Sequence, residues 1–439
     1  MDFITYVGQT LIEALPNIMA GYEGEIKASD LSAMEKSIKE MGQEMGKEVM
    51  EWWLEAQEEK YPATEQRCEC GGQAHYVRRR RGVSITLQGR VSYGRAYYLC
   101  PDCGRGYYPL DKRLGIRPGE MSEEVVKQAA LLGVQDAFGA ARETLKELTL
   151  LELSHSSIQK ASQMMGEGVI AAEEVLKQHS QDFDSQLEQR RSQQKPQRLY
   201  GSMDGFMVPL EDGWHEMKAG AWWTTRTRRD GSLAAQDIHY YVDLQPAEQF
   251  SDLVWATGFA HLADQAQELV FVADGADWIW RIVDRLYPQA IQIVDWYHAC
   301  QYIAPVAQLA FNDPSRRQAW IDEVTDALWK GDVDTVINAC TPFIRPDLKP
   351  DQDPAQKAVT YYTNNRHRMD YPAYRDQGLM IGSGSMESGC KQIGLERLKI
   401  AGARWSPDGA RKLAKARAAY LSHQWSTTSP LHDPLPKAA

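Results

Sequence analysis

The chain has 439 residues, of which 43% are hydrophobic and 25% charged, a composition typical of a globular protein with roughly two to four domains. No apolar run reaches the about 20 residues that a membrane span needs, and the N-terminus lacks a signal-peptide pattern, so we expect a cytoplasmic protein that does not contact membranes. The net charge of −11 does not exclude nucleic acid, because phosphate binding needs only one basic face. The basic residues are in fact segregated: 11 oppose three acids from Arg67 to Arg117, and eight oppose two from Lys391 to Arg417.

The first 118 residues predict a helix followed by strands. Residues 1–65 are expected to form an N-terminal helical segment, because apolar side chains recur every three or four positions between Met34 and Trp53. Residues 66–118 are rich in Gly, Tyr and Arg and alternate in polarity, which indicates short antiparallel strands.

Residues 119–197 predict three helices and a polar linker, with Ser154 or Ser156 as the N-cap of the third helix. Three short helices are compatible with a DNA-binding helix-turn-helix module, although any small helical bundle has the same pattern. The side chains of the third helix that could read bases are Gln159, Lys160 and Gln163.

Residues 198–422 predict a mixed α/β domain. Three consecutive strands precede alternating helices and strands, which is the order of a ribonuclease-H-like sheet. The polar residues 301–375 have the pattern of a helical insertion in this domain, and residues 423–439 have the composition of a disordered tail.

The seven cysteines divide into two close pairs and three isolated residues. The pairs lie on Gly-containing turns at the two ends of the strand-rich stretch and comprise Cys68, Cys70, Cys100 and Cys103. Four thiolates so placed can close a tetrahedral Zn²⁺ site, so we predict a zinc ribbon over residues 66–118, with disulfides or free thiols as the alternative. Ordinary buried thiols are expected at Cys300, Cys340 and Cys390.

Three acidic residues stand at notable points of the predicted elements: Asp204 within the first strand of the α/β domain, Asp274 at the end of a later strand, and Glu387 at the start of a late helix. An acid in an apolar strand is unfavourable unless it is paired or binds metal. Three convergent carboxylates could hold two Mg²⁺ (or Mn²⁺) ions for phosphodiester chemistry. Each Asp alone is also compatible with a turn residue, because both precede Gly.

Asp295 and His298 follow a strand at helical spacing and form a further candidate pair. They could orient a water molecule, a phosphate or a catalytic carboxylate, or they could be a helix N-cap and a packed histidine. The glycines around Glu387 do not indicate a dinucleotide-binding loop, because no strand–turn–helix unit surrounds them.

Two basic stretches are predicted to contact DNA phosphates, with a solvated basic face as the alternative. The first lies in the strand-rich segment and comprises Arg78, Arg79, Arg80 and Arg81. The second follows Glu387 and comprises Lys391, Arg397, Lys399, Arg404, Arg411, Lys412 and Lys415. Within it, Trp405 could stack on a splayed base.

Several motifs together resemble the bacterial insertion-sequence transposases of the ISKra group, which are DDE transposases distantly related to the Mutator-like ones. The motifs are CECGG, LCPDCGRGYYPLDKRLG, MDG, VADGADWIW, VDWYHA and NNRHRMDY, followed by GSGSMESGCKQIGLERLKIAGARW, and the likeness spans residues 66–422. The resemblance implies a ribonuclease-H-like catalytic domain whose triad is Asp204, Asp274 and Glu387. It also implies a supporting role for Asp295 and His298.

The expected function is therefore that of a DNA transposase, which cleaves the ends of an insertion sequence and transfers them to target DNA. Its partners would be double-stranded DNA with terminal inverted repeats and a second copy of the chain, because recombining two ends needs two active sites. The alternatives are a catalytically silent DNA-binding protein derived from a transposase and a nuclease that cleaves without joining.

Overall fold

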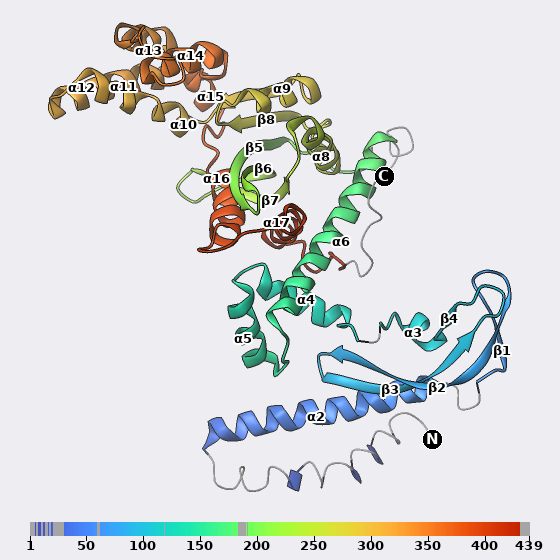
Figure 1. Ribbon diagram of the computed structural model, residues 1–439. Helices are drawn as coiled ribbons and strands as arrows, with labels where there is room; N and C mark the ends of the chain where they lie inside the picture. The colour runs from blue at the N-terminus through green and yellow to red at the C-terminus, as the bar shows by residue number, and fades with distance from the viewer. Residues whose placement is uncertain are drawn as a thin grey trace. The chain divides into compact units, whose positions relative to one another are not determined.

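A computed structural model of the protein describes residues 30–58, 62–117, 119–182, 190 and 192–430, with scattered residues between 5 and 20. They form two compact units, Met1–Met164 and Met165–Ala439, and each contains a β-sheet and helices (Figure 1). Most of the predicted N-terminal helical segment before Asp30 lies outside the described residues, as does much of the predicted linker.

The first unit pairs one long helix with an antiparallel sheet. Helix α2 (Leu31–Gln57) starts at Asp30, whose carboxylate accepts the Ala33 N–H at 3.0 Å. The sheet has the order β1 (Glu65–Arg67), β2 (Gln73–Thr86), β3 (Gly89–Leu99) and β4 (Gly106–Tyr107), so the predicted antiparallel strands are confirmed.

Helix α2 contacts the sheet through residues next to the predicted apolar stripe. Leu54 packs on Val91, Tyr93 and Leu110, whereas Trp53, on the predicted apolar stripe, is 40% exposed. The helical periodicity thus predicted the helix correctly, but it placed Trp53 on the buried face where the structure has the next residue, Leu54.

The three predicted helices of residues 119–197 are present as α4 (Glu123–Gly133), α5 (Phe138–Thr149) and α6 (His155–Gln181), after a short α3 (Pro109–Leu114). Ser154 caps α6, because its hydroxyl accepts the Ser157 N–H at 3.1 Å. Lys160, one of the predicted base-reading residues, lies 3.8 Å from the carboxylate of Glu120.

The second unit contains a five-stranded sheet with the order β7-β6-β5-β8-β9. Strands β5 (Arg198–Leu210), β6 (Gly213–Thr227) and β7 (Leu233–Asp243) are antiparallel, while β8 (Glu268–Ala273) and β9 (Ile291–Val294) run parallel to β5. All five strands occur where the sequence predicts them. Strand β8 reads as a continuous apolar run because it lies between two parallel neighbours and is buried over nearly its whole length.

Helices connect and flank these strands. Helix α8 (Ala247–Ala260) joins β7 to β8, α9 (Asp277–Leu286) joins β8 to β9, and α10 (Trp296–Gln301) follows β9 (Figure 1). A group of helices then separates α10 from α16 and comprises α11 (Ile303–Ala310), α12 (Pro314–Trp329), α13 (Val333–Cys340), α14 (Pro354–Asn365) and α15 (Tyr371–Asp376). Within the part of the chain that the structure describes, no helix is long and apolar enough to cross a membrane.

The chain ends with α16 (Gly384–Cys390), a π-helical continuation (Lys391–Leu398) and α17 (Pro407–Leu421). Residues 423–430 of the predicted disordered tail have a defined path, in which the Gln424 amide bonds His239 Nδ1 at 2.9 Å. Residues 431–439 lie outside the described residues.

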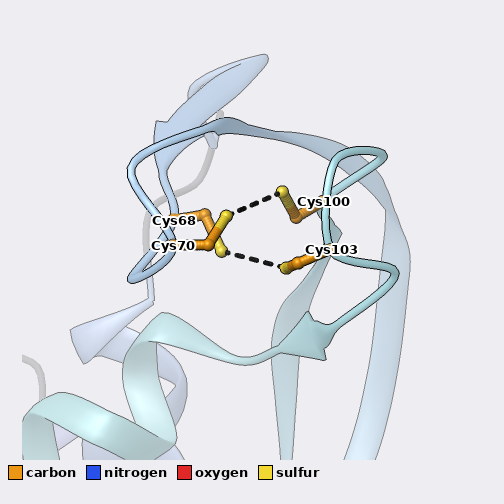
Figure 2. A group of neighbouring side chains, drawn as sticks. All are labelled: Cys68, Cys70, Cys100 and Cys103. Atoms are coloured by element: carbon orange, nitrogen blue, oxygen red, sulfur yellow. Dashed lines mark hydrogen bonds between the residues drawn. The ribbon is translucent and has the colours of Figure 1, made fainter.

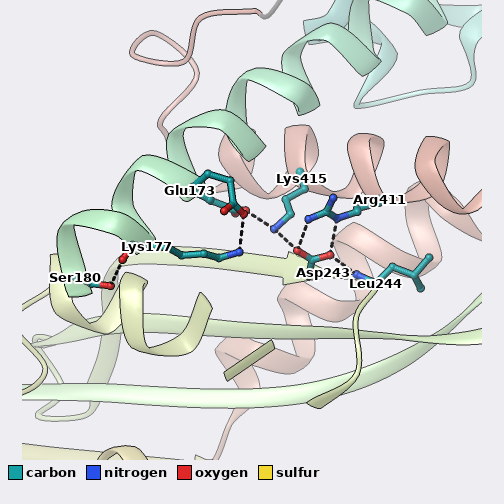
Figure 3. A network of polar contacts seen from close by, with 8 residues as sticks. Glu173, Lys177, Ser180, Asp243, Leu244, Arg411 and Lys415 are labelled. Atoms are coloured by element: carbon teal, nitrogen blue, oxygen red, sulfur yellow. Dashed lines mark hydrogen bonds and ion pairs between the residues drawn. The ribbon is translucent and has the colours of Figure 1, made fainter. Parts of the chain in front are cut away.

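A buried ionic network joins α17 to β7 and α6 (Figure 3). Asp243, 1% exposed at the end of β7, accepts hydrogen bonds from Arg411 at 2.7 and 3.0 Å and lies 2.9 Å from Lys415 Nζ. Lys415 also pairs with Glu173 of α6. Burial alone would raise the pKa of Asp243, but Lys415 and Arg411 lower it to about 2.

This network corrects the predicted basic face of residues 391–415. Lys415 is 1% exposed, and Lys412 pairs with Glu167 and Asp408, so these cations neutralise acids inside the unit. The spacing of the basic residues looked like a solvated face because their acidic partners are distant in the sequence.

We expect Lys415→Met to lower the free energy of unfolding by about 3 kcal/mol, because it leaves the Glu173 carboxylate buried without its cation. Denaturant unfolding measures this, with the exposed Lys391→Met as the control, which should change stability by less than about 0.5 kcal/mol. Since the folded pKa of Asp243 is below its unfolded value, the stabilisation is complete above pH of about 4 and is lost as the pH falls toward 2. Equal unfolding midpoints for the two variants would contradict the assignment.

Candidate functional site

Four thiols meet between two loops of the first unit (Figure 2). Cys68 and Cys70 lie between β1 and β2, and Cys100 and Cys103 lie between β3 and β4. The Sγ atoms of Cys68 and Cys103 are 3.7 Å apart, as are those of Cys70 and Cys100, and all four lie within 4.8 Å of one another. A tetrahedral site with Zn–S bonds of about 2.3 Å places its sulfur atoms about 3.8 Å apart, so the cluster could hold zinc.

The backbone explains how a pair with one intervening residue fits this geometry. The Cys68 N–H donates to the Gly72 carbonyl at 2.8 Å, and Gly71, at φ 94°, donates to the Cys68 carbonyl at 3.0 Å. Gly104, at φ 69°, closes the second turn by donating to the Cys100 carbonyl at 2.9 Å. The positive φ angles favour glycine, which is why each cysteine turn contains one. A backbone hydrogen bond from Cys70 and contacts with the other three thiols lower the pKa of Cys68 to about 7, whereas the same thiol contacts raise the pKa of Cys70, so without a metal one thiol of the cluster is the favoured thiolate.

The second candidate site begins with two neighbouring strands of the second unit. Gly201 of β5 is paired with Phe271 of β8, and three positions beyond this pair come Asp204, still within β5, and Asp274, the first residue after β8. Burial raises the pKa of the half-buried Asp204, and the negative charge of Asp274 raises it further. Hydrogen bonds from the Cys390 thiol and from the Gly205 N–H at 2.7 Å act in the opposite direction.

Asp274 sits in a turn that the helices hold in place. Its carboxylate accepts the Ala276 N–H at 2.9 Å, and its backbone carbonyl accepts the Tyr361 hydroxyl of α14 at 2.8 Å. Gly275 has φ 98°, and a Cβ atom there would lie 2.7 Å from the Tyr361 ring, so the turn admits only glycine. The expected turn geometry of Asp274 is thus present, and its side chain remains part of the acidic group.

Among the described residues of this unit, Asp295, His298 and Glu387 form a group of possible metal ligands, with one ligand atom of each within 4.8 Å of the others. His298 Nε2 lies 3.4 Å from Glu387 Oε1. Asp295 is fully buried and accepts the His298 N–H at 2.8 Å, the Ser383 hydroxyl at 2.9 Å and the Ser383 N–H. It is therefore the N-cap of α10, and it also holds the start of α16, so that Glu387 faces His298.

The structure thus brings the five predicted residues to one region in two groups. Asp204 in the middle of β5 lies close enough to Asp274, directly after β8, for its pKa to be raised by that charge, and the positive charge that His298 can carry lowers the pKa of Asp204. Among the described residues, however, the tight cluster contains Glu387 without Asp204 and Asp274. Cys390, predicted to be an ordinary buried thiol, proves to contact Asp204. Its position one helical turn after Glu387 was the available signal.

The predicted DNA-contacting residues divide by exposure. Arg78, Arg79, Arg80 and Arg81 are all exposed on β2, where Arg80 stacks on the Tyr97 ring at 4.1 Å. Lys391 and Arg404 are also exposed, and Lys399 is half-buried. Arg397 and Trp405 are 0% and 8% exposed, and the Trp405 indole N–H donates to the Leu398 carbonyl at 2.9 Å. As placed, these last two side chains cannot reach a phosphate or a base, so we no longer assign them to a DNA-contacting surface.

Sequence reasoning missed a third basic group at the tip of the β6–β7 hairpin. Arg226, Arg228 and Arg229 are exposed, and none forms an ion pair within the described part of the chain. The run TTRTRRDGS was the signal, but charged hairpin loops are common on protein surfaces.

The chain belongs to the uncharacterised protein family UPF0236, whose family model matches residues 27–427. It is 22% identical over 403 residues to the UPF0236 protein TTE2489 of Caldanaerobacter subterraneus subsp. tengcongensis, covering 89% of this chain and 79% of the relative. Another relative from the same strain, UPF0236 protein TTE0610/TTE0881/TTE1053/TTE2432, is 22% identical over 76% of this chain and 66% of its own length. A third, with eleven joined TTE designations in its name, is 22% identical over 87% of this chain and 75% of its own length.

Purified protein should contain about one zinc ion per chain, bound by the four clustered cysteines. Cys100→Ser should reduce the zinc content to less than a third and lower the melting temperature, because a metal site that forms only in the folded state stabilises it. The control is Cys340→Ser, which removes a buried thiol of α13 outside the cluster. Elemental analysis measures both, and a folded wild-type protein without zinc would contradict the assignment.

Proposed function

We propose that this member of the UPF0236 family is a DNA transposase with Asp204, Asp274 and Glu387 as its catalytic carboxylates. The observation that carries the proposal is the parallel pairing of β5 with β8, which sets Asp204, in the middle of β5, near Asp274, directly after the end of β8. Three antiparallel strands followed by two parallel ones is the ribonuclease-H-like order. That order supports the finer fold assignment made from the sequence.

The acidic residues fit the hard cations that phosphoryl transfer uses. Carboxylate oxygens are the preferred ligands of Mg²⁺ and Mn²⁺, and a pair of nearby acids whose mutual repulsion raises the pKa of Asp204 is stabilised by a cation. Asp204, Asp274 and Glu387 would hold two ions, which when bound stabilise the attacking and leaving oxygens of a phosphodiester.

The other residues of the site would position these ligands. His298, 3.4 Å from Glu387, orients that carboxylate, and Asp295 fixes α10 and α16 to each other. The proposed reaction begins with hydrolysis at the end of the element, which leaves a 3′-hydroxyl. That hydroxyl then attacks a phosphodiester of the target, so that a new bond to the target forms as a target bond breaks.

The names of two relatives join several designations from one strain, which we interpret as several gene copies of one protein. One relative carries eleven joined designations and another carries four, all from one strain. Several designations for one protein are expected where several gene copies encode it, and near-identical copies are what a mobile element produces. A non-catalytic DNA-binding protein would need a separate explanation for such copies.

The first unit would supply DNA binding. A cysteine cluster that could hold zinc stands at one end of the β2–β3 hairpin, and four exposed arginines lie along β2. The substrate would be double-stranded DNA with terminal inverted repeats, and two copies of the chain would act on the two ends.

Glu387→Gln should reduce Mg²⁺-dependent cleavage of the element's ends by about a thousandfold or more, because it removes one metal-binding carboxylate. The matched control is Glu396→Gln, nine residues further on, whose carboxylate is 3.6 Å from Arg417 and which should retain most activity. Cleavage and strand transfer are measured on DNA that carries the ends of the element. Wild-type cleavage without joined products would indicate a nuclease, and DNA binding without cleavage would indicate a silent DNA-binding protein.

Replacing all four of Arg78–Arg81 by Gln should weaken DNA binding and lower the slope of log K against log salt concentration by about 0.9 for each lost phosphate contact. The control replaces four exposed basic residues of the second unit, namely Arg281, Arg316, Lys349 and Lys357. If the slope is unchanged in the β2 variant, these arginines do not contact phosphates.

A further inference from the structure

An open cavity of about 610 Å³ adjoins the carboxylate site in the second unit. Its walls come from α10, α12, α15 and the segment that leads into α16, and they include Trp296, Tyr297, Trp329, Arg375 and Gly382. Neither the metal ligands nor the reaction proposed above uses this cavity.

The walls are aromatic and partly open to solvent. Tyr297 is 67% exposed and Trp329 is 39% exposed, although large apolar rings are usually buried. The Trp296 and Trp329 rings meet edge to face with centroids 4.8 Å apart, and the Arg375 guanidinium lies 3.6 Å above the Trp329 ring. Because these contacts already fix the two tryptophan side chains, a ligand that stacks on them costs little further side-chain entropy.

The cavity is joined to the acidic site through the chain itself. Trp296 and Tyr297 are the two residues between Asp295 and His298, and Gly382 precedes the Ser383 that bonds Asp295. A Cβ atom at Gly382 would lie 3.5 Å from the Tyr297 ring and 3.7 Å from Asp295 Oδ2. A ligand in the cavity would therefore lie close to Asp295 and to the segment that leads into α16, from which Glu387 comes.

The charge beside the cavity is positive. Leu233, at the start of β7, lines the cavity, and the hairpin tip before it presents Arg226, Arg228 and Arg229. These arginines are exposed, and within the described ranges no carboxylate neutralises them in an ion pair.

We infer that this cavity binds unpaired nucleotides of a DNA strand next to the reacting phosphodiester. Every base has a flat face that can stack on an aromatic ring, and arginines along the same path bind the phosphates. Tyr297 and Trp329 would receive the bases, and the hairpin arginines would hold the backbone. The identity of the ligand as DNA rests on the proposed function, whereas the stacking site rests on the cavity itself.

The test is binding of a labelled oligothymidylate of about 12 nucleotides in buffer without Mg²⁺ or Mn²⁺ and without a chelator, so that cleavage does not occur and bound zinc is kept. Tyr297→Ala and Trp329→Ala should each weaken binding about tenfold, while their affinity for blunt duplex DNA stays within about twofold of the wild type. Tyr297→Phe keeps the ring and should bind like the wild type. The matched control is Trp214→Ala, because Trp214 is 61% exposed at the opposite end of β6.

Several outcomes would overturn the inference. They are wild-type binding by both alanine variants, an equal loss in Trp214→Ala, a tenfold loss in Tyr297→Phe, or tighter binding of oligouridylate than of oligothymidylate. Equal melting temperatures exclude misfolding as the cause of a loss. If stacking is detected but the ends of an element are never cleaved, the proposed transposase activity fails and the binding site remains. If cleavage occurs and the alanine variants bind normally, only the binding site fails.

Discussion

The parallel pairing of β5 with β8 determines where the acidic side chains of the candidate site lie. Because Gly201 of β5 is paired in parallel with Phe271 of β8, Asp204 in the middle of β5 and Asp274 just after β8 come close to each other, although a hairpin, a third strand and a helix separate them in the chain. Two carboxylates in a half-buried position repel each other, and the pKa of Asp204 is raised by burial and by Asp274. The Cys390 thiol, the Gly205 N–H and His298 offset this only in part, so a positive charge close to Asp204 would favour its ionised form.

The long helical segment between α10 and α16 is fastened to the same edge of the sheet by tyrosine hydroxyls. Tyr361 donates to the carbonyl of Asp274, Tyr371 to that of Val294 at 3.1 Å, and Tyr374 to that of Gln292 at 3.2 Å. Because these carbonyls belong to the ends of β8 and β9, the helices stiffen the strand ends that precede the acids. Asp295, just before α10, accepts a hydrogen bond from Ser383, just before α16. Both ends of the helical segment are therefore held together at the site.

The sequence could predict the elements but not the burial of their charged residues. Strands β5 to β9 and the cysteine turns have local signals, namely period-2 alternation, apolar runs and glycine positions, and the structure contains them where expected. The interior positions of Arg397 and Lys415 have no local signal, because Lys415 depends on Asp243 and Glu173, which lie far away in the chain. Trp53 and Leu54 show the same limit, since adjacent apolar residues of a helix leave the buried face undetermined by one position.

The distribution of ion pairs matters more than the net charge for a polyanionic ligand. A cation that is bonded to a buried acid attracts a distant phosphate only weakly. Lys415 and Arg411 in the second unit are therefore not expected to bind DNA phosphates, and neither is Arg95 in the first unit, which pairs with Asp111. The arginines of β2 and of the β6–β7 hairpin are exposed and are bonded to no buried acid among the described residues, although Arg81 lies 3.7 Å from the exposed carboxylate of Glu55. The hairpin group lies beside an aromatic cavity that adjoins acids of the opposite sign. A phosphate backbone drawn to these arginines would therefore approach the carboxylates only where a bound cation screens their repulsion.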